Sequence, residues 1–271
     1  MQVAADSLQL NSRSFASLPP PAPGTRSMPQ STARDRLIVA LDTPSIEEAQ
    51  RLVAALDETV SFYKVGLELL FSGGLDLARA LKSNGKRVFL DMKLLDIGNT
   101  VERAVANASE LGLDFLTVHG HDLKTLRAAV AGRGQSRLKL LAVTVLTNLT
   151  ADDLRQQGSA MSPGDLVLAR ARMAHESGFD GVVASGQEAQ RIREAVGPGF
   201  LVVTPGIRLP GSTTDDQERI TTPESAIKGG ADHIVVGRPI TQADDPKAAA
   251  ETFVHHIREA LAALLRGAGN A

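Results

Sequence analysis

The 271-residue sequence predicts one (β/α)8 barrel of the TIM type, preceded by a disordered extension. Short apolar, β-branched runs alternate with amphipathic stretches eight times from residue 36 onward, which indicates parallel strands joined by helical crossovers. Aromatic residues make up only 3% of a chain that is 43% hydrophobic. The core is therefore built from Val, Leu, Ile and Ala, as in parallel sheets covered by helices. A barrel of about 200 to 250 residues fits the length of this chain.

The extension comprises residues 1–34, which are rich in Ser, Pro, Arg and Gln and lack apolar periodicity. Segments of this composition do not bury enough apolar surface to fold, so we expect disorder. An organelle transit peptide is the alternative, because the segment contains Arg and Ser and few acidic residues. Residues 35–271 are then expected to form the barrel domain.

Each predicted strand is a short run of mainly Val, Leu, Ile or Phe, and most are bounded by polar residues or glycine. In chain order they are LIVALD (37–42), SFYKVG (61–66), RVFLDMK (87–93), DFLTVHG (114–120), KLLAVTVLT (139–147), DGVVAS (180–185), FLVVTPG (200–206) and DHIVVGR (232–238). An open doubly wound sheet is the alternative fold. That fold usually carries a G-x-G-x-x-G turn after its first strand, and ALDTPS stands there instead.

Amphipathic stretches fill the intervals between the strands. SIEEAQRLVAAL (45–56) follows the first strand, and Ser45 with Glu48 forms a capping-box pattern at its start. TVERAVANASEL (100–111) follows the third strand. The last helix, from about Pro246 to Leu265, closes the outer ring.

Composition excludes several functional classes. A net charge of −2 gives neither a basic stripe for nucleic acid nor a polybasic patch for membranes. The chain has no cysteine, which excludes thiolate chemistry and disulfides and is compatible with a reducing compartment. Because no apolar run reaches the roughly 18 residues of a membrane span, we expect a cytoplasmic protein.

Polar residues and glycines collect where the predicted strands end, and in barrel enzymes the carboxyl ends of the strands carry the chemistry. In chain order they are Asp42, Lys64, Asp91, Lys93, His119, Thr147, Pro205, Gly206, Gly237 and Arg238. Strand period places Asp91 and Lys93 on one face, directed into the barrel mouth. Asp96 follows in the loop. A solvated cluster of salt bridges is the structural alternative for a single pair, but so many polar strand ends favour an active site.

A phosphate site is predicted after the seventh and eighth strands, where barrels often bind phosphate. The long loop that begins TPGIRLPGSTTDDQER contains Arg208 and Gln217, and we expect residues 207–220 to form a mobile lid. Gly237 permits a close approach of the backbone, and Arg238 offers a forked cationic donor.

A metal site is not expected. His119 and His121 stand two residues apart, but no third ligand is spaced to complete a set, and Lys93 would repel a cation held between the aspartates. We likewise expect no cofactor.

These motifs together resemble the orotidine 5′-phosphate decarboxylase family, over the stretch from about Arg36 to Leu265. The segments that carry the resemblance are IVALD, FYKVG, DMKLLDIGNT, VTVLTN, TPGIR with DDQERI behind it, and IVVGRPIT. The resemblance implies cofactor-free decarboxylation of orotidine 5′-monophosphate to UMP in de novo pyrimidine synthesis. It also implies a homodimer.

The resemblance assigns roles position by position. It implies a catalytic network of Lys64, Asp91, Lys93 and Asp96, in which Lys93 is the acid, and it places Asp96 and Thr100 in the neighbouring subunit's site. Asp42 and Lys64 match positions near the ribose, and Thr147 matches one near the pyrimidine. Pro205, Arg208, Gln217, Gly237 and Arg238 match substrate-binding positions on the phosphate side.

The sequence departs from the family pattern at two places. DIGNT replaces the more usual DIPNT, through Gly98, and Leu94-Leu95 stands where some relatives have Phe-His. Related sugar-phosphate barrels share D-x-K-x-x-D but use magnesium, so a magnesium-dependent keto-sugar phosphate decarboxylase or aldolase is one alternative. A nucleotide-binding barrel without catalysis is the other.

Overall fold

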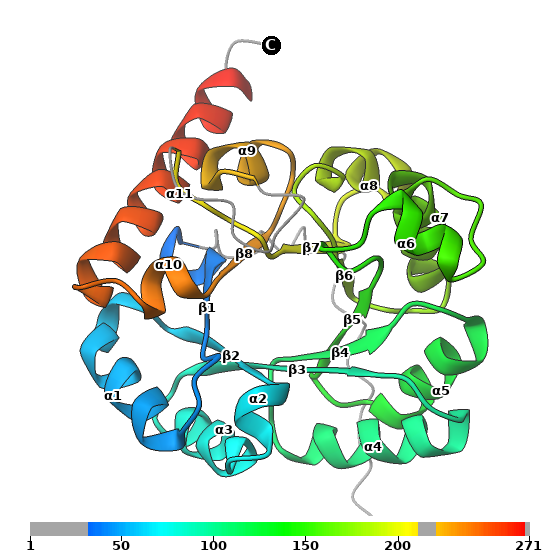
Figure 1. The fold of residues 1–271 in the computed structure, drawn as a ribbon, viewed down its shortest axis with the longest axis horizontal. Coiled ribbons are helices and arrows are strands. Elements are labelled where there is room, and N and C mark those ends of the chain that lie inside the picture. The colour runs from blue at the N-terminus through cyan, green and yellow to red at the C-terminus, as the bar shows by residue number, and fades with distance from the viewer. Residues whose placement is uncertain (1–31, 211–220, 269–271) are drawn as a thin grey trace, which may run out of the picture. The chain divides into compact units, whose positions relative to one another are not determined.

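Eight parallel strands close into a barrel in the order β1 to β8 (Figure 1). The structure is a computed structural model that describes residues 32–210 and 221–268. The strands are β1 Leu37–Ala40, β2 Phe62–Gly66, β3 Arg87–Leu94, β4 Phe115–His119, β5 Lys139–Val143, β6 Gly181–Val183, β7 Leu201–Thr204 and β8 His233–Val236. Pairing of β1 with β8, for example Leu37 with Ile234, completes the ring and excludes the open sheet.

Helices surround the ring of strands (Figure 1). Those described are α1 Ile46–Leu56, α2 Leu67–Leu70, α3 Gly74–Ser83, α4 Gly98–Glu110, α5 Leu123–Arg133, α6 Ala151–Gln156, α7 Pro163–Glu176, α8 Ala189–Val196, α9 Pro223–Lys228, α10 Arg238–Thr241 and α11 Pro246–Ala268. Short 3-10 turns, η1 Arg34–Arg36 and η2 Asp57–Thr59, precede β1 and β2. None of the described helices is both long and apolar enough to cross a membrane.

All eight predicted strands are present, with small differences at their ends. The largest difference is in β5, which was expected to run to Thr147 but leaves the sheet after Val143. Val145 lies outside the strand yet is buried, so the apolar pattern continued past the end of the ladder. The expected extension, residues 1–34, falls almost entirely outside the described residues.

The core has two layers. The larger one fills the space between the strands and the helices. The smaller one fills the inside of the barrel, and its members are Ile38, Ala40, Phe62, Phe89, Phe115, Leu141, Val203 and Val235. Three of the chain's few aromatic residues, Phe62, Phe89 and Phe115, therefore lie in the barrel interior.

Side-chain caps fix the starts of several helices. Ser45 is the N-cap of α1, and its side chain accepts the Glu48 N–H at 3.2 Å, which is one of the two hydrogen bonds of the predicted capping box. A reciprocal capping box forms at α6, where Thr150 and Asp153 each bind the other's backbone N–H.

Three aspartates fasten the amino end of the barrel, and we call each of them an aspartate clamp. Each precedes an even-numbered strand and accepts a backbone N–H from the strand before it, and each is paired with a cationic side chain. The acceptor bonds are Asp114 from Val88 (2.8 Å), Asp180 from Leu140 (2.9 Å) and Asp232 from Val202 (2.8 Å). The cations are Lys82, Arg133 and Arg193, at 2.7, 2.6 and 2.7 Å. Ser61 occupies the corresponding position before β2.

Candidate active site

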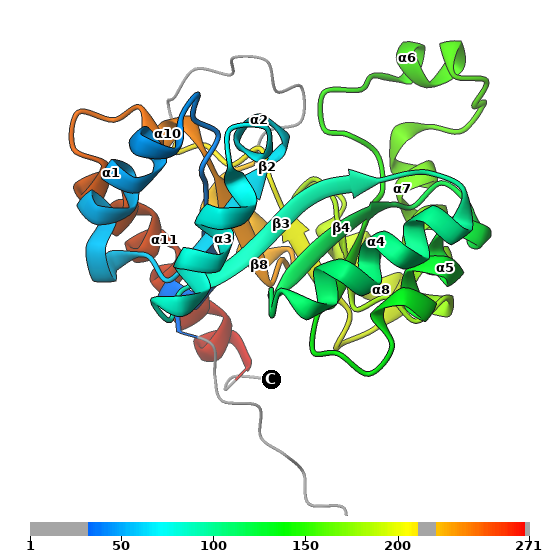
Figure 2. The same cartoon turned by 90° about the horizontal axis from the view of Figure 1, so that it is seen from below.

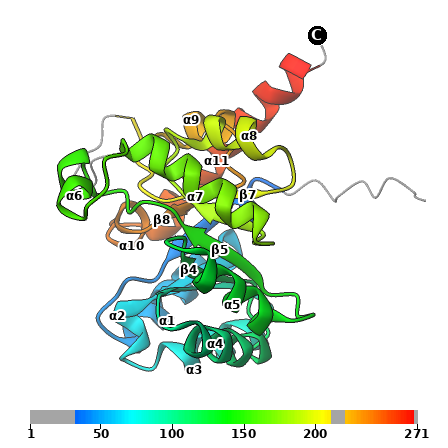
Figure 3. The ribbon, with the colours of Figure 1, turned by 90° about the vertical axis from the view of Figure 1, so that its right-hand side faces the viewer.

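A cavity of about 630 Å³ opens at the carboxyl ends of the strands. The short helices α2, α6 and α10 all lie at this end, and α6 stands clear of the barrel wall (Figures 2 and 3). The top of the barrel core forms an apolar floor, made by Ala40, Phe89, Val143, Val183 and Val235. The sequence-predicted residues that line the cavity are Asp42, Lys64, Asp91, Lys93, Thr147, Pro205, Gly206, Arg208, Gly237 and Arg238.

Four charged side chains form an alternating row along one wall. Lys64 Nζ lies 2.9 Å from Asp42 Oδ1 and 3.5 Å from Asp91 Oδ2. The same Asp91 oxygen accepts a hydrogen bond from Lys93 Nζ at 2.8 Å. Each inner charge is thus flanked by opposite charges, which offsets the free-energy cost of removing the row from water.

The two inner members, Lys64 and Asp91, are nearly buried, each with 8% of its surface exposed. Burial alone would disfavour their charges, but the neighbouring opposite charges outweigh it. The carboxylates of Asp91 and Asp42 raise the pKa of Lys64 above its ordinary value. Lys64 and Lys93, with hydrogen bonds from Lys93 and Thr117, hold the pKa of Asp91 below its ordinary value. Both groups are therefore charged at neutral pH.

Lys93 reaches Asp91 by an irregular backbone. The contact was predicted from strand alternation, but β3 bulges here, because its pairing with β4 steps from Leu90–Leu116 directly to Leu94–Val118. Lys93 has φ = 49°, in the left-handed region that non-glycine residues seldom adopt. The contact of Lys93 with Asp91 is present as expected. It is produced by a β-bulge, and not by the regular strand alternation from which it was predicted.

The side of the cavity that was predicted to bind phosphate is formed by the ends of β7 and β8. Gly237 precedes the short helix α10, which begins at Arg238, and Thr241 and Gln242 also line the cavity. Arg208 is 93% buried and donates from Nη1 to the carbonyl of Ile207 at 3.0 Å. Of the expected lid, only residues 207–210 are described, and Gln217 lies outside the described residues.

Asp96 and Thr100 do not join the other residues in this chain. Both are exposed, and neither lines the cavity. Asp96 accepts the N–H of Ile97 at 2.6 Å, at the turn into α4. Leu95 and Ile97 beside it are large apolar side chains with 51% and 78% of their surface exposed.

The chain is similar to known proteins over most of its length. A family profile described as "Orotidine 5′-phosphate decarboxylase / HUMPS family" matches residues 35–253. The chain belongs to this family. It is 55% identical over 225 residues to orotidine 5′-phosphate decarboxylase of Rhodopseudomonas palustris (strain BisA53), covering 83% of this chain and 95% of the relative. It is 53% identical over 234 residues to the enzyme of that name from Methylorubrum extorquens (strain PA1), covering 86% of this chain and the whole relative.

A solved structure shares the fold. The crystal structure of orotidine 5′-phosphate decarboxylase from Lactobacillus acidophilus superimposes with a TM-score of 0.72 at 39% sequence identity. The match covers 82% of this chain and 98% of that one. The predicted barrel is therefore confirmed both within the chain and by a relative of the orotidine 5′-phosphate decarboxylase family.

Two histidines, His119 and His121, lie at and just after the end of β4, and the charges of Lys93 and Asp91 act on His119. The rings of His119 and His121 pack edge to face with centroids 4.9 Å apart. Burial, with the charges of His121 and Lys93, lowers the pKa of His119 to about 4, so this ring is neutral at pH 7. In the described parts of the chain, no three His, Cys, Asp or Glu side chains are grouped to hold a metal ion.

Two residues that sequence reasoning missed shape the site of this family member. A Cβ added to Gly66 would lie 2.9 Å from both Asp42 Oδ1 and Lys64 Nζ, so glycine leaves the room in which that pair meets. Thr117, fully buried on β4, binds both Asp91 and the backbone of Lys93. Glycine at a strand end and threonine within a strand are both common, so neither carried a signal.

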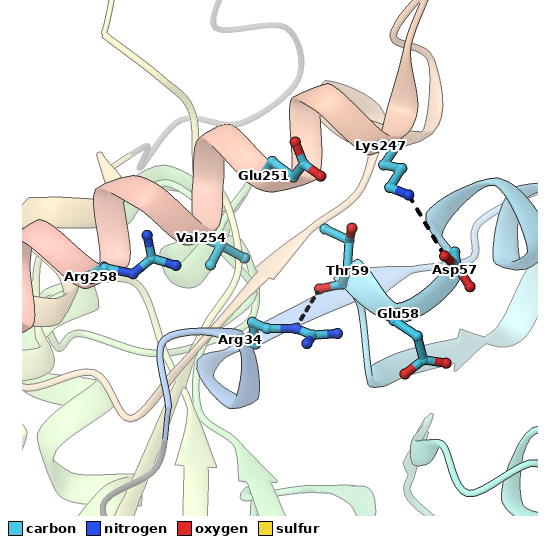
Figure 4. A pocket seen from close by; sticks show the side chains of 8 residues that line it. All are labelled: Arg34, Asp57, Glu58, Thr59, Lys247, Glu251, Val254 and Arg258. Atoms are coloured by element: carbon cyan, nitrogen blue, oxygen red, sulfur yellow. Dashed lines mark hydrogen bonds and ion pairs between the residues drawn. The ribbon is translucent and has the colours of Figure 1, made fainter.

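A second hollow of about 480 Å³ lies near the amino ends of the strands, beside η1, η2 and α11 (Figure 4). It is lined by both acidic and basic side chains, among which Lys247 lies 3.7 Å from Asp57, and Arg34 donates to the carbonyl of Thr59 at 3.3 Å. None of the predicted site residues lines it. The cavity at the carboxyl ends of the strands is therefore the candidate active site.

Proposed function

We propose that this protein decarboxylates orotidine 5′-monophosphate to UMP and CO2, as a step of de novo pyrimidine synthesis. The observation that carries the proposal is the ion pair of Lys93 with Asp91 at the wall of a cavity whose other side is formed by Arg208, Gly237 and Arg238. Relatives that share more than half of their residues with this chain bear the corresponding enzyme name.

The chemistry requires an acid next to the reacting carbon. When the bond between C6 and the carboxylate breaks, CO2 leaves and the electron pair stays on C6. A cationic Lys93 stabilises this developing carbanion and then transfers a proton from Nζ to C6, which forms UMP. Asp91 of the same chain and Asp96 of the neighbouring subunit in a homodimer are proposed to flank that lysine, and no cofactor or metal is proposed to take part.

Asp91 has a second proposed role. Its carboxylate is held charged by Lys64 and Lys93. Placed against the substrate carboxylate, it disfavours the bound substrate more than the transition state, in which charge has moved away from that group. Loss of CO2 relieves the repulsion.

The phosphate is proposed to bind away from the reacting ring. Arg238 and the backbone at Gly237 lie at the N-terminus of α10, and Arg208 and Pro205 come from the chain after β7. Binding of this remote group supplies free energy that closes residues 207–220, including Gln217, over the ring. Asp42 and Lys64 are proposed to bind the ribose, and Thr147 the pyrimidine.

The decisive experiment follows the absorbance of orotidine 5′-monophosphate with purified protein in excess EDTA. We expect full turnover, and we expect Lys93→Ala to abolish it while circular dichroism shows an intact fold. Absence of turnover of orotidine 5′-monophosphate, together with decarboxylation of a keto-sugar phosphate that EDTA abolishes, would indicate the magnesium-dependent sugar-phosphate chemistry. Tight binding of UMP without turnover would indicate a non-catalytic barrel.

A further inference from the structure

Asp91 and Lys93 are both hydrogen-bonded to the side chain of Thr117. Thr117 Oγ1 donates to Asp91 Oδ1 at 2.8 Å and accepts the backbone N–H of Lys93 at 2.9 Å. The threonine is fully buried and does not line the cavity. The Thr117 hydroxyl therefore connects the backbone of Lys93 to the Asp91 carboxylate, which also binds the Lys93 side chain.

We propose that Thr117 is a positioning residue of the active site, whose hydroxyl fixes both the Asp91 carboxylate and the bulged backbone of Lys93. This inference rests on the proposed decarboxylation, because it concerns the geometry of the proposed acid.

The β3 bulge explains why such a contact is needed. Between the paired residues Leu90–Leu116 and Leu94–Val118, β3 places three residues opposite Thr117 alone. The ladder leaves the Lys93 N–H without its usual strand partner, and the Thr117 hydroxyl accepts it instead. A residue other than glycine is unfavourable in the left-handed region of backbone conformation and persists there only where surrounding contacts determine it.

The two oxygens of Asp91 are also divided between different partners. Oδ2 binds the lysines, at 2.8 Å from Lys93 and 3.5 Å from Lys64. Oδ1 binds Thr117. The hydroxyl thus sets the rotation of the carboxylate, and this rotation decides which oxygen faces the two ammonium groups.

The test compares Thr117→Val, which keeps the shape and removes the hydroxyl, with Thr117→Ser, which keeps the hydroxyl. Because a hydrogen bond to a charged group is lost, we expect Thr117→Val to lower kcat by about 10- to 100-fold. UMP affinity, measured by calorimetry, should stay near the wild-type value. Asp91 then protonates at higher pH, so the acid limb of the kcat profile should move upward. Thr117→Ser should restore both kcat and the profile.

Thr204→Val is the matched control. Thr204 is a fully buried strand threonine, like Thr117, and its Oγ1 has no hydrogen-bond partner among the described residues. This variant should keep the wild-type kcat and pH profile. If Thr117→Val also keeps both, the proposal is wrong.

Two further comparisons cover other outcomes. If Thr117→Val does not fold, Thr117→Ala and Thr117→Ser differ only in the hydroxyl, and equal kcat values for the two would overturn the proposal. If the wild-type protein does not turn over orotidine 5′-monophosphate, the proposed function fails, and crystal structures decide about Thr117. If Lys93 keeps its positive φ angle in the crystal structure of Thr117→Val, the proposal is contradicted. If the Lys93 backbone leaves the left-handed region, the proposal is supported.

Discussion

Lys93 illustrates how residue-scale geometry departs from sequence pattern. The motif D-x-K placed it beside Asp91, and the ion pair is present. The bulge and the left-handed backbone were not predictable, because lysine has no preference for that region and because the partner that stabilises it, Thr117, lies 24 residues away in sequence. The sequence predicted that Lys93 and Asp91 meet, but the backbone geometry by which they meet is determined by the packing of β3 against β4.

The absence of a side chain at Gly66 leaves room for the Asp42–Lys64 ion pair, and a substitution tests whether that room is needed. In Gly66→Ala the new Cβ would lie 2.9 Å from Asp42 Oδ1 and Lys64 Nζ. Both atoms end flexible side chains and can move, so the free energy of unfolding should change little. The displaced pair should weaken substrate binding, and we expect KM to rise about tenfold, which corresponds to one hydrogen bond. Steady-state kinetics and thermal unfolding measure the two effects.

Gly267→Ala is the control for this prediction, because nothing lies within 4 Å of a Cβ built there. It should leave KM unchanged. If KM is also unchanged in Gly66→Ala, substrate binding does not depend on the space that glycine leaves beside Lys64.

Element boundaries were predictable where local chemistry sets them. Ser45 is the N-cap of α1, which begins at Ile46, and Pro246 is the first residue of α11, as expected. The end of β5 was not predictable, because Val145 continues the apolar pattern after the ladder has ended. Asp96 was expected in a loop and lies there, but its role depends on a second subunit and stays a prediction.

Gly98 is the first residue of α4 and supports a prediction at the scale of the element. A Cβ there meets only ordinary contacts, the nearest being Ala128 Cβ at 3.5 Å, and Ile97 before it is extended, with ψ = 137°. The first position of a helix and an extended preceding residue both suit proline. Gly98→Pro should therefore raise the free energy of unfolding by about 0.4 to 1 kcal/mol, by restricting the unfolded chain. Denaturant titration measures it.

Gly98→Ala separates two effects in this prediction. It removes the freedom of glycine without adding a ring, so it should give a smaller gain than proline. A proline variant less stable than wild type would show that the turn before α4 needs the glycine.

The fold is the feature that the sequence predicts best, because eight repeated strand and helix units give a redundant signal. Assembly was less accessible, since this single chain leaves Asp96 outside its own cavity. The exposed side chains of Leu95 and Ile97 flank it. They suit a second subunit that would receive Asp96 and Thr100.

Mixing two inactive variants tests this assembly. If Asp96 acts in the neighbouring site, a dimer of one Lys93→Ala chain and one Asp96→Ala chain contains one intact site. Random exchange between symmetric dimers should then restore about a quarter of wild-type activity. If Asp96 acts within its own chain, the mixture stays inactive. Each variant alone is the control.

His233 supports a prediction about acid stability. Burial at the amino end of the barrel, with the charge of Arg87, lowers the pKa of this histidine to about 3. In the unfolded chain it binds a proton near pH 6.5, so stability is lost as the pH falls below that value. Between pH 6 and 4.5 the free energy of unfolding should fall by an extra amount of about 1.4 kcal/mol per pH unit. His233→Gln should remove this part of the slope.

The exposed His255 provides the comparison, because His255→Gln makes the same substitution at a residue that is not buried. Equal slopes for His233→Gln and the wild-type protein would show that another group controls acid unfolding.

The aspartate clamps lie at the end of the barrel where the strands begin, and the proposed chemistry lies where they finish. Closure of the ring is therefore secured away from the loops that would meet a substrate. Such a division suits evolutionary change, since loops at the mouth can be exchanged, lengthened or redesigned for a new phosphorylated ligand while the strands stay in register. The same scaffold is for that reason a suitable starting point for building new catalysts.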